Sequence, residues 1–94
     1  MTDTQLLVGS LSNDLFRVAN LIQRQAFTGS SRFMQEAKRW AVALKDSSTP
    51  TYIGNIAQEI VAADDNPVSL GDAEKYLMYG VILQNYALHN RKVI

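Results

Sequence analysis

The side chains that could do chemistry in this sequence are one histidine and two small groups of carboxylates. His89 lies near the C-terminus, and no Asp or Glu occupies position 85, 86 or 92, so it lacks neighbours at metal-ligand spacing. The carboxylates at residues 64–65, and Asp72 with Glu74, lie beside expected helix ends, where such residues usually cap or terminate a helix. We therefore expect His89 to interact with a helix C-terminal dipole, and we expect no metal site.

Motifs for nucleophilic catalysis and phosphate binding are also missing. The chain has no cysteine, which excludes thiolate chemistry and disulfides. Ser30 and Ser31 follow a glycine, but no base is placed to activate either hydroxyl. The patterns GxGxxG, GxxxxGKS/T and GxSxG do not occur. We predict a non-enzymatic protein with no catalytic residues and no cofactor.

Charge gives little indication of a partner. Nine Lys and Arg balance nine Asp and Glu, with six against four in residues 1–47 and three against five in residues 48–94. A net charge of zero removes the strong electrostatic argument for nucleic acid and disfavours it as a partner. The alternative is a small nucleic-acid-associated regulator, and its basic face would be formed by Arg17, Arg24, Lys38 and Arg39.

Apolar spacing predicts two helices in the first half of the chain. The first runs from about 4 to 27, ends at Gly29 and has its apolar stripe at helical intervals, formed by Leu7, Leu11, Leu15, Val18, Ile22 and Ala26. Ser12 is a candidate for a later N-cap of this helix. The second runs over 31–46 after a cap at Ser30 or Ser31, with a stripe that includes Phe33, Ala37, Trp40, Ala41 and Leu44.

Two further helices are predicted in the second half, over 50–63 and 70–90. Pro50 suits a first helical turn, and Ser69 with Asp72 has capping-box spacing. Val68 and Ala73 stand where a hydrophobic staple would form. Because the turns are short, residues 1–94 are expected to form a single helical domain. Its fold class is all-α, an antiparallel up-and-down four-helix bundle that is complete alone or after dimerisation.

Two helices have more apolar surface than one core needs. On a helical wheel the fourth helix has Tyr76, Gly80, Leu83 and Ala87 on one face, flanked by Leu77, Val81 and Leu88, while Met78, Tyr79, Ile82 and Tyr86 lie on the far side. The first helix adds Phe16 and Phe27, which lie away from its main stripe. Because aromatic residues are enriched at interfaces, we predict an interface formed by Phe16, Phe27, Tyr79, Ile82 and Tyr86.

These observations favour a protein–protein interaction or small regulatory adaptor module, self-associating as a homodimer or binding a helical protein partner. The alternative in which the surplus side chains pack inside a monomer stays open, as does an apolar ligand pocket lined by Trp40 and the tyrosines. The longest apolar run covers residues 76–83, far short of the roughly 20 residues that span a bilayer, so no membrane association is expected. We expect a cytoplasmic protein.

Overall fold

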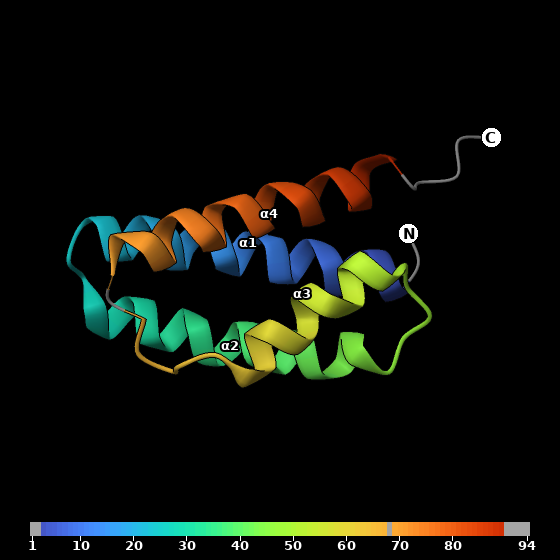
Figure 1. The fold of residues 1–94 in the computed structure, drawn as a ribbon, viewed down its shortest axis with the longest axis horizontal. Helices are drawn as coiled ribbons and strands as arrows, with labels where there is room; N and C mark the ends of the chain where they lie inside the picture. The colour runs from blue at the N-terminus through green and yellow to red at the C-terminus, as the bar shows by residue number, and fades with distance from the viewer. Residues whose placement is uncertain (1–2, 68, 90–94) are drawn as a thin grey trace.

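The computed structural model describes residues 3–67 and 69–89, and all regular structure within these ranges is helical (Figure 1). The four helices are α1 (Asp3–Gln23), α2 (Phe27–Lys45), α3 (Thr51–Ala62) and α4 (Leu70–His89). Successive helices run in opposite directions along the long axis of the molecule. The predicted all-α, antiparallel four-helix bundle is confirmed.

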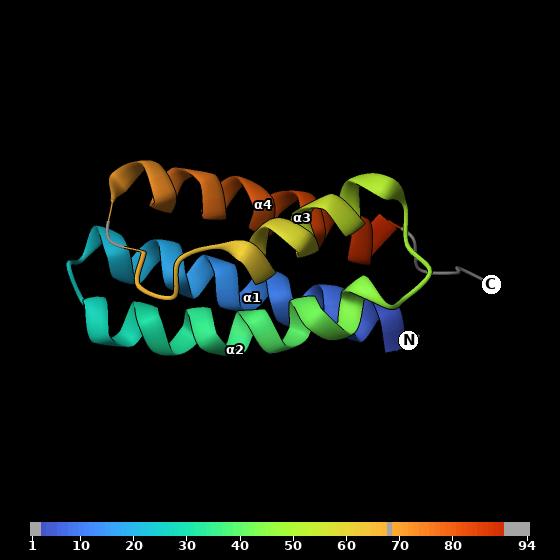
Figure 2. The ribbon, with the colours of Figure 1, turned by 60° about the horizontal axis from the view of Figure 1, so that its bottom comes forward.

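Helix α1 is the centre of the packing arrangement. It packs along both α2 and α4, and α2 packs in turn against α3. The shorter α3 crosses the other helices obliquely (Figure 2). The core is formed where these helices meet, and α1 contributes the fully buried side chains Val8, Leu11, Leu15, Val18 and Ile22 to it. Four of these five residues belong to the predicted stripe.

The turn between α1 and α2 differs from the sequence prediction. Helix α1 ends at Gln23, not at Phe27, and the left-handed residue of the turn is Gln25, with φ of 60°. Gly29 lies inside α2, where an added Cβ would lie 3.2 Å from a methyl carbon of Leu21. The glycine at position 29 therefore allows α2 to pack closely on α1, and it does not terminate a helix.

The predicted caps of α2 are also wrong. The helix begins at Phe27, and its N-cap residue, Ala26, makes no side-chain capping hydrogen bond. The Ser30 hydroxyl donates to the Phe27 carbonyl at 3.0 Å, and the Ser31 hydroxyl donates to the Asn66 side-chain oxygen at 2.7 Å. Ser31 thus ties the first turn of α2 to the loop that follows α3.

The starts of α3 and α4 lie close to the predicted positions. Pro50 is the N-cap residue of α3, one position before the helix begins. The Ser69 hydroxyl accepts a hydrogen bond from the Asp72 backbone N–H at 2.9 Å, which confirms the predicted cap of α4. The predicted staple between Val68 and Ala73 falls partly outside the described residues, as does the predicted helix end at residue 90.

Candidate interaction surface

The rotation of α4 about its axis is set by its contact with α1. The Ser12 hydroxyl, which lies inside α1 and caps no helix, donates to the Gly80 carbonyl at 2.7 Å. The Phe16 ring lies directly on Gly80, since a Cβ added to this glycine would lie 2.9 Å from Phe16 Cε1. A glycine at position 80 therefore makes room for an aromatic ring, and these two contacts fix which side of α4 faces the core.

The tyrosine side of α4 faces α3. The Tyr79 hydroxyl donates to a carboxylate oxygen of Glu59, and the ring of Tyr86 packs edge-on against Tyr52 with centroids 6.3 Å apart. Ile82 is partly buried against the same core. The hydrogen bond to Glu59, followed by partial burial, raises the pKa of Tyr79 to about 12. These side chains bridge two helices of one chain.

The structure therefore separates the five residues predicted to form an interface. Tyr79, Ile82 and Tyr86 lie together on α4 toward α3, while Phe16 packs between α1 and α4. Phe27 lies apart from them, 39 % exposed in the first turn of α2. Their participation in an interface stays a prediction, but four of the five already have partners inside the bundle.

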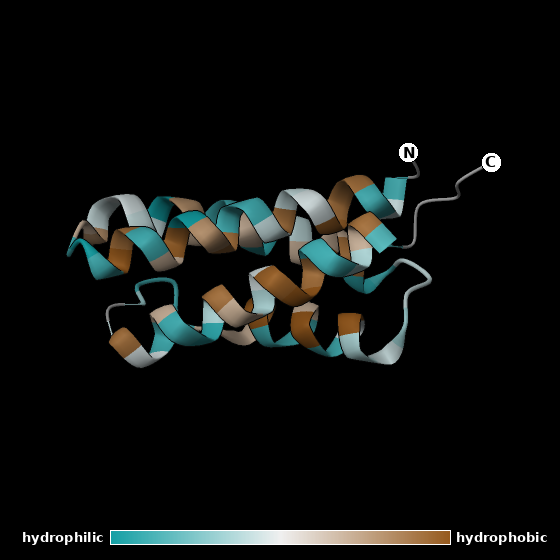
Figure 3. Cartoon of the chain, turned by 90° about the horizontal axis from the view of Figure 1, so that it is seen from above, coloured by the Kyte–Doolittle hydropathy of each residue, from teal (hydrophilic) through white to brown (hydrophobic). Residues whose placement is uncertain are grey.

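Apart from Met78, the exposed large apolar side chains of α4 form a different set. We call Leu70, Leu77, Val81 and Leu88 the apolar line, and they are 67, 43, 44 and 53 % exposed. They are seven, four and seven residues apart, which places them along one side of the helix. Figure 3 looks onto the bundle from the α4 side and shows hydrophobic residues recurring along this helix.

The polar residues between these positions complete a heptad pattern. Glu74 and Gln84, both exposed, continue the alternating spacing of four and three residues from position 70 to position 88. This 4–3 spacing is that of the contact seam of a two-stranded coiled coil. On the sequence wheel, Leu77, Val81 and Leu88 flank the core face. The wheel therefore grouped three of the four residues of the line, but it did not place Leu70 with them or show that they are exposed.

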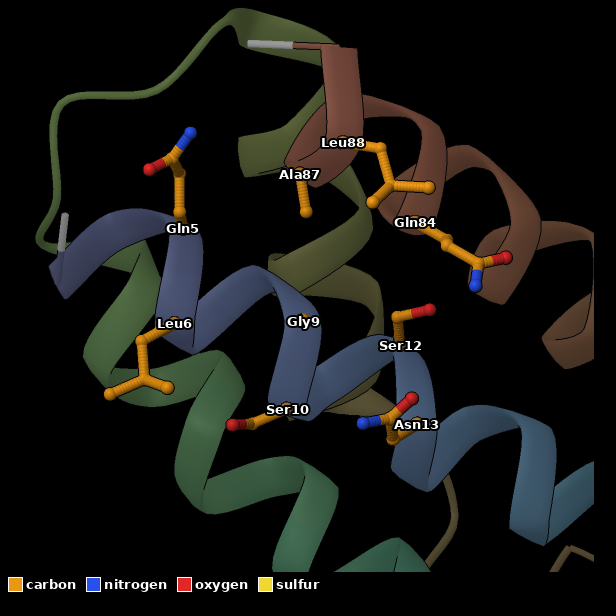
Figure 4. Close-up of a pocket in the computed structure, with 9 residues that line it drawn as sticks. All are labelled: Gln5, Leu6, Gly9, Ser10, Ser12, Asn13, Gln84, Ala87 and Leu88. Carbon is orange, nitrogen blue, oxygen red and sulfur yellow. The ribbon is translucent and has the colours of Figure 1, made fainter. Parts of the chain in front are cut away.

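A hollow of about 290 Å³ adjoins the Leu88 end of the apolar line (Figure 4). It lies between the first half of α1 and the last turns of α4, and its lining includes Leu6, Gly9, Asn13, Gln84, Ala87 and Leu88. A Cβ added to Gly9 would meet no atom within 4 Å, so the missing side chain at this position leaves open space. The hollow is a recess on the surface beside the line, and it is open to a side chain from outside.

A buried carboxyl lies on the opposite side of α1, against α2. Asp14 is 3 % exposed, accepts a hydrogen bond from the Trp40 indole N–H at 3.0 Å and faces Glu36. Burial, with the hydrogen bond and the negative charge of Glu36, raises the pKa of Asp14 from 3.8 to about 7, against the opposing effects of Trp40 and Arg17. Sequence reasoning missed Asp14, although its spacing from Leu11 and Val18 places it on the apolar stripe of α1.

The aromatic residues proposed to line a ligand pocket have other contacts. Trp40 packs against the core while its indole N–H donates to Asp14. Tyr79 and Tyr86 lie toward α3, on another side of the bundle. The structure therefore does not bring Trp40 and these tyrosines together, and the hollow beside Leu88 includes none of them.

Two of the four residues of the proposed basic face make contacts within the chain. Arg17 lies 3.8 Å from Asp14 and 5.1 Å above the Phe33 ring. The Lys38 ammonium donates to the carbonyls of residues 61 and 63 at the end of α3 and pairs with the Asp65 carboxylate at 3.0 Å. Arg24 and Arg39 are exposed. Lys38 thus satisfies carbonyl groups that a helix C-terminus leaves unpaired.

The class of protein that this fold defines is the all-α four-helix bundle. Comparisons with models of protein families, with curated proteins and with solved structures gave no match for the chain. Within the described residues no helix is long and apolar enough to cross a membrane, and no three His, Cys, Asp or Glu side chains are grouped as a metal site would require.

Proposed function

We propose that this chain is a non-enzymatic protein-interaction module, an adaptor that self-associates through the apolar line of α4. The observation that supports the proposal most directly is the exposure of Leu70, Leu77, Val81 and Leu88 along one side of a single helix. Scattered exposed apolar residues are normal, whereas four of them in one row at coiled-coil spacing are typical of a contact surface.

The free energy available from burying the apolar line favours a reversible association. Burying a leucine completely contributes roughly 1.5–3 kcal/mol, so a side chain that is about half exposed has roughly 1 kcal/mol still to gain. Four such residues on each of two chains give a gross gain of roughly 8 kcal/mol. Association itself costs about 4–15 kcal/mol before any contact is counted. We therefore propose a monomer–dimer equilibrium that depends on concentration, supplemented by contacts beside the line.

The setting proposed for this module is the cytoplasm. The chain contains no cysteine, which suits a protein that works without disulfides in a reducing compartment. An adaptor of this kind needs no catalytic group, and its activity consists of presenting or joining bound chains.

The proposal is tested by the solution mass of the wild-type chain, measured by light scattering after size exclusion over a hundredfold range of concentration. A mass that rises from one chain toward two with increasing concentration supports it. Circular dichroism at the same concentrations checks that helicity stays constant. A mass that stays at one chain throughout, with the helical signal intact, contradicts self-association.

A further inference from the structure

We propose that two copies of this chain pair antiparallel through α4, with Leu70 of each copy seated at the Leu88 end of the other. This arrangement rests on the proposed self-association and specifies its geometry. It follows from three features of the described surface: the symmetry of the apolar line, the charge at Glu74 and the position of the hollow.

The exposed seam of α4 is symmetric about position 79. Its six exposed residues are, in order, Leu70, Glu74, Leu77, Val81, Gln84 and Leu88. A two-fold axis through the centre of this seam places position 70 opposite 88, 74 opposite 84, and 77 opposite 81. Each apolar side chain then meets an apolar side chain, and each polar one meets a polar one. A two-fold interface requires this self-complementarity.

The charge at Glu74 distinguishes the antiparallel from the parallel arrangement. In a parallel, in-register pair the two Glu74 carboxylates would face each other across the seam, and like charges at such positions repel. In the antiparallel pair each Glu74 faces the Gln84 amide of the second copy. Asn13, which lines the hollow together with Gln84, adds a second amide on that side. Amide N–H groups donate to a carboxylate, so the antiparallel pairing is electrostatically complementary.

The hollow lies where the antiparallel pair needs one. Side chains at a coiled-coil seam insert as knobs into holes formed by four residues of the facing helix. Gln84, Ala87 and Leu88 have the spacing of three corners of such a hole, and all three line the hollow. The knob that reaches this position is Leu70 of the second copy, the most exposed of the large apolar side chains described. The unfilled space at Gly9 leaves room beside it.

The pairing is tested with single-cysteine variants, because the chain has no cysteine of its own. Glu74→Cys and Gln84→Cys alter polar, exposed positions and leave the apolar line intact. The mixed pair keeps one of its two contacts between Glu74 and Gln84, and the Gln84→Cys like pair keeps both Glu74 carboxylates. In the antiparallel pair positions 74 and 84 face each other across helix axes about 8–10 Å apart. Two copies of position 74 are instead offset by about 15 Å along the helix axis, at 1.5 Å per residue. A short bifunctional maleimide reaches the first pair and not the second.

The two variants are crosslinked separately and as an equal mixture, one of them bearing a small tag so that mixed and like products separate on a gel. Ala43→Cys, an exposed position on α2, sets the background for random collision. We expect the mixed product to exceed the Gln84→Cys like product several-fold, because that variant keeps the Glu74 charge that opposes the parallel pair. Adding Val81→Glu to both variants should return the mixed product to background.

Three other results would overturn the pairing, and they separate it from self-association itself. A Gln84→Cys like product as strong as the mixed product indicates that the copies also pair parallel, because this variant keeps Glu74. All products at background, with a dimer mass by light scattering, place the contact elsewhere on the chain. In both cases self-association stands. A monomer mass at the crosslinking concentration, with products at background, contradicts self-association and the pairing together.

Discussion

Replacing Asp14 by asparagine is expected to remove most of the pH dependence of stability between about pH 4 and pH 7. The native carboxyl is buried against α2, with Glu36 beside it, so the folded protein binds its proton more tightly than the unfolded chain does. Within that window the folded state therefore binds more protons, and the free energy of unfolding falls as pH rises. The stabilisation is fully present below the unfolded pKa and is lost by the time the folded pKa is passed.

The size of the effect follows from the difference between the two pKa values. The pKa of Asp14 rises from 3.8 to about 7, and each pKa unit corresponds to about 1.4 kcal/mol. The ionised carboxylate therefore costs at most about 4 kcal/mol above pH 7, a large part of the 5–15 kcal/mol typical of small domains. Asparagine keeps an acceptor for the Trp40 indole and has no charge. The Asp14→Asn variant should be about 2–4 kcal/mol more stable than wild type at pH 8 and within about 1 kcal/mol of it at pH 4.

Urea denaturation, monitored by circular dichroism between pH 4 and pH 8.5, measures the free energy of unfolding of both proteins. The fluorescence of Trp40, the only tryptophan, should report the same titration in the native state because its indole N–H donates to Asp14. Glu36→Gln removes a neighbouring charge, so it should lower the pKa of Asp14 and shrink the pH dependence. Asp3→Asn, an exposed change on the same helix, is the matched control.

This reasoning would be refuted if the free energy of unfolding changed with pH in the same way in wild type and in Asp14→Asn. Such a result would mean that the buried carboxyl has the same proton affinity in the folded and unfolded chains. A smaller slope in Glu36→Gln than in wild type, with no change in Asp3→Asn, would assign the effect to the contact between α1 and α2.

Three further predictions concern the packing and the hydrogen bonds of the bundle. Gly80→Ala should destabilise the fold by about 1–3 kcal/mol in urea titrations, because the new methyl group overlaps the Phe16 ring. Gly9→Ala should instead stabilise the fold by about 0.5–1 kcal/mol, because the added Cβ meets open space. Equal effects of the two changes would contradict the packing described. Ser12→Ala should cost about 1 kcal/mol through the buried hydrogen bond to the Gly80 carbonyl, and thermal melts showing no loss would count against that bond. Lys38→Met should lower the free energy of unfolding by about 1–2 kcal/mol and speed amide hydrogen exchange in α3 more than in α1. An equal increase of exchange in both helices would argue against a specific role of Lys38 at the end of α3.

The fold was predictable where local signals agree. The stripe through Leu11, Leu15 and Val18 marks the core side of α1, and the cap at Ser69 marks the start of α4. The connection between α1 and α2 was not predictable from residue types alone. Gly29 has the residue type of a helix end, but its lack of a side chain serves the contact with Leu21, and the turn uses a left-handed Gln25 instead.

The exposed side of α4 could not be assigned from the sequence for a different reason. Both flanks of its core face are apolar, so a helical wheel cannot tell which flank a neighbouring helix covers. In the structure α3 covers the flank of Tyr79 and Tyr86, and Leu77 and Val81 on the other flank stay exposed. That outcome depends on contacts between residues far apart in the chain, such as Ser12 with Gly80.

The measurement that tests the central claim most directly is the solution mass of Val81→Glu beside its matched control, Val42→Glu. Both valines are about half exposed, at 44 % and 51 %, but only Val81 belongs to the apolar line, while Val42 lies on α2. At a concentration where wild type is largely dimeric, we predict one chain for Val81→Glu and an unchanged dimer for Val42→Glu. Equal dimer masses for the two variants, with helicity preserved, would contradict the assignment of self-association to α4.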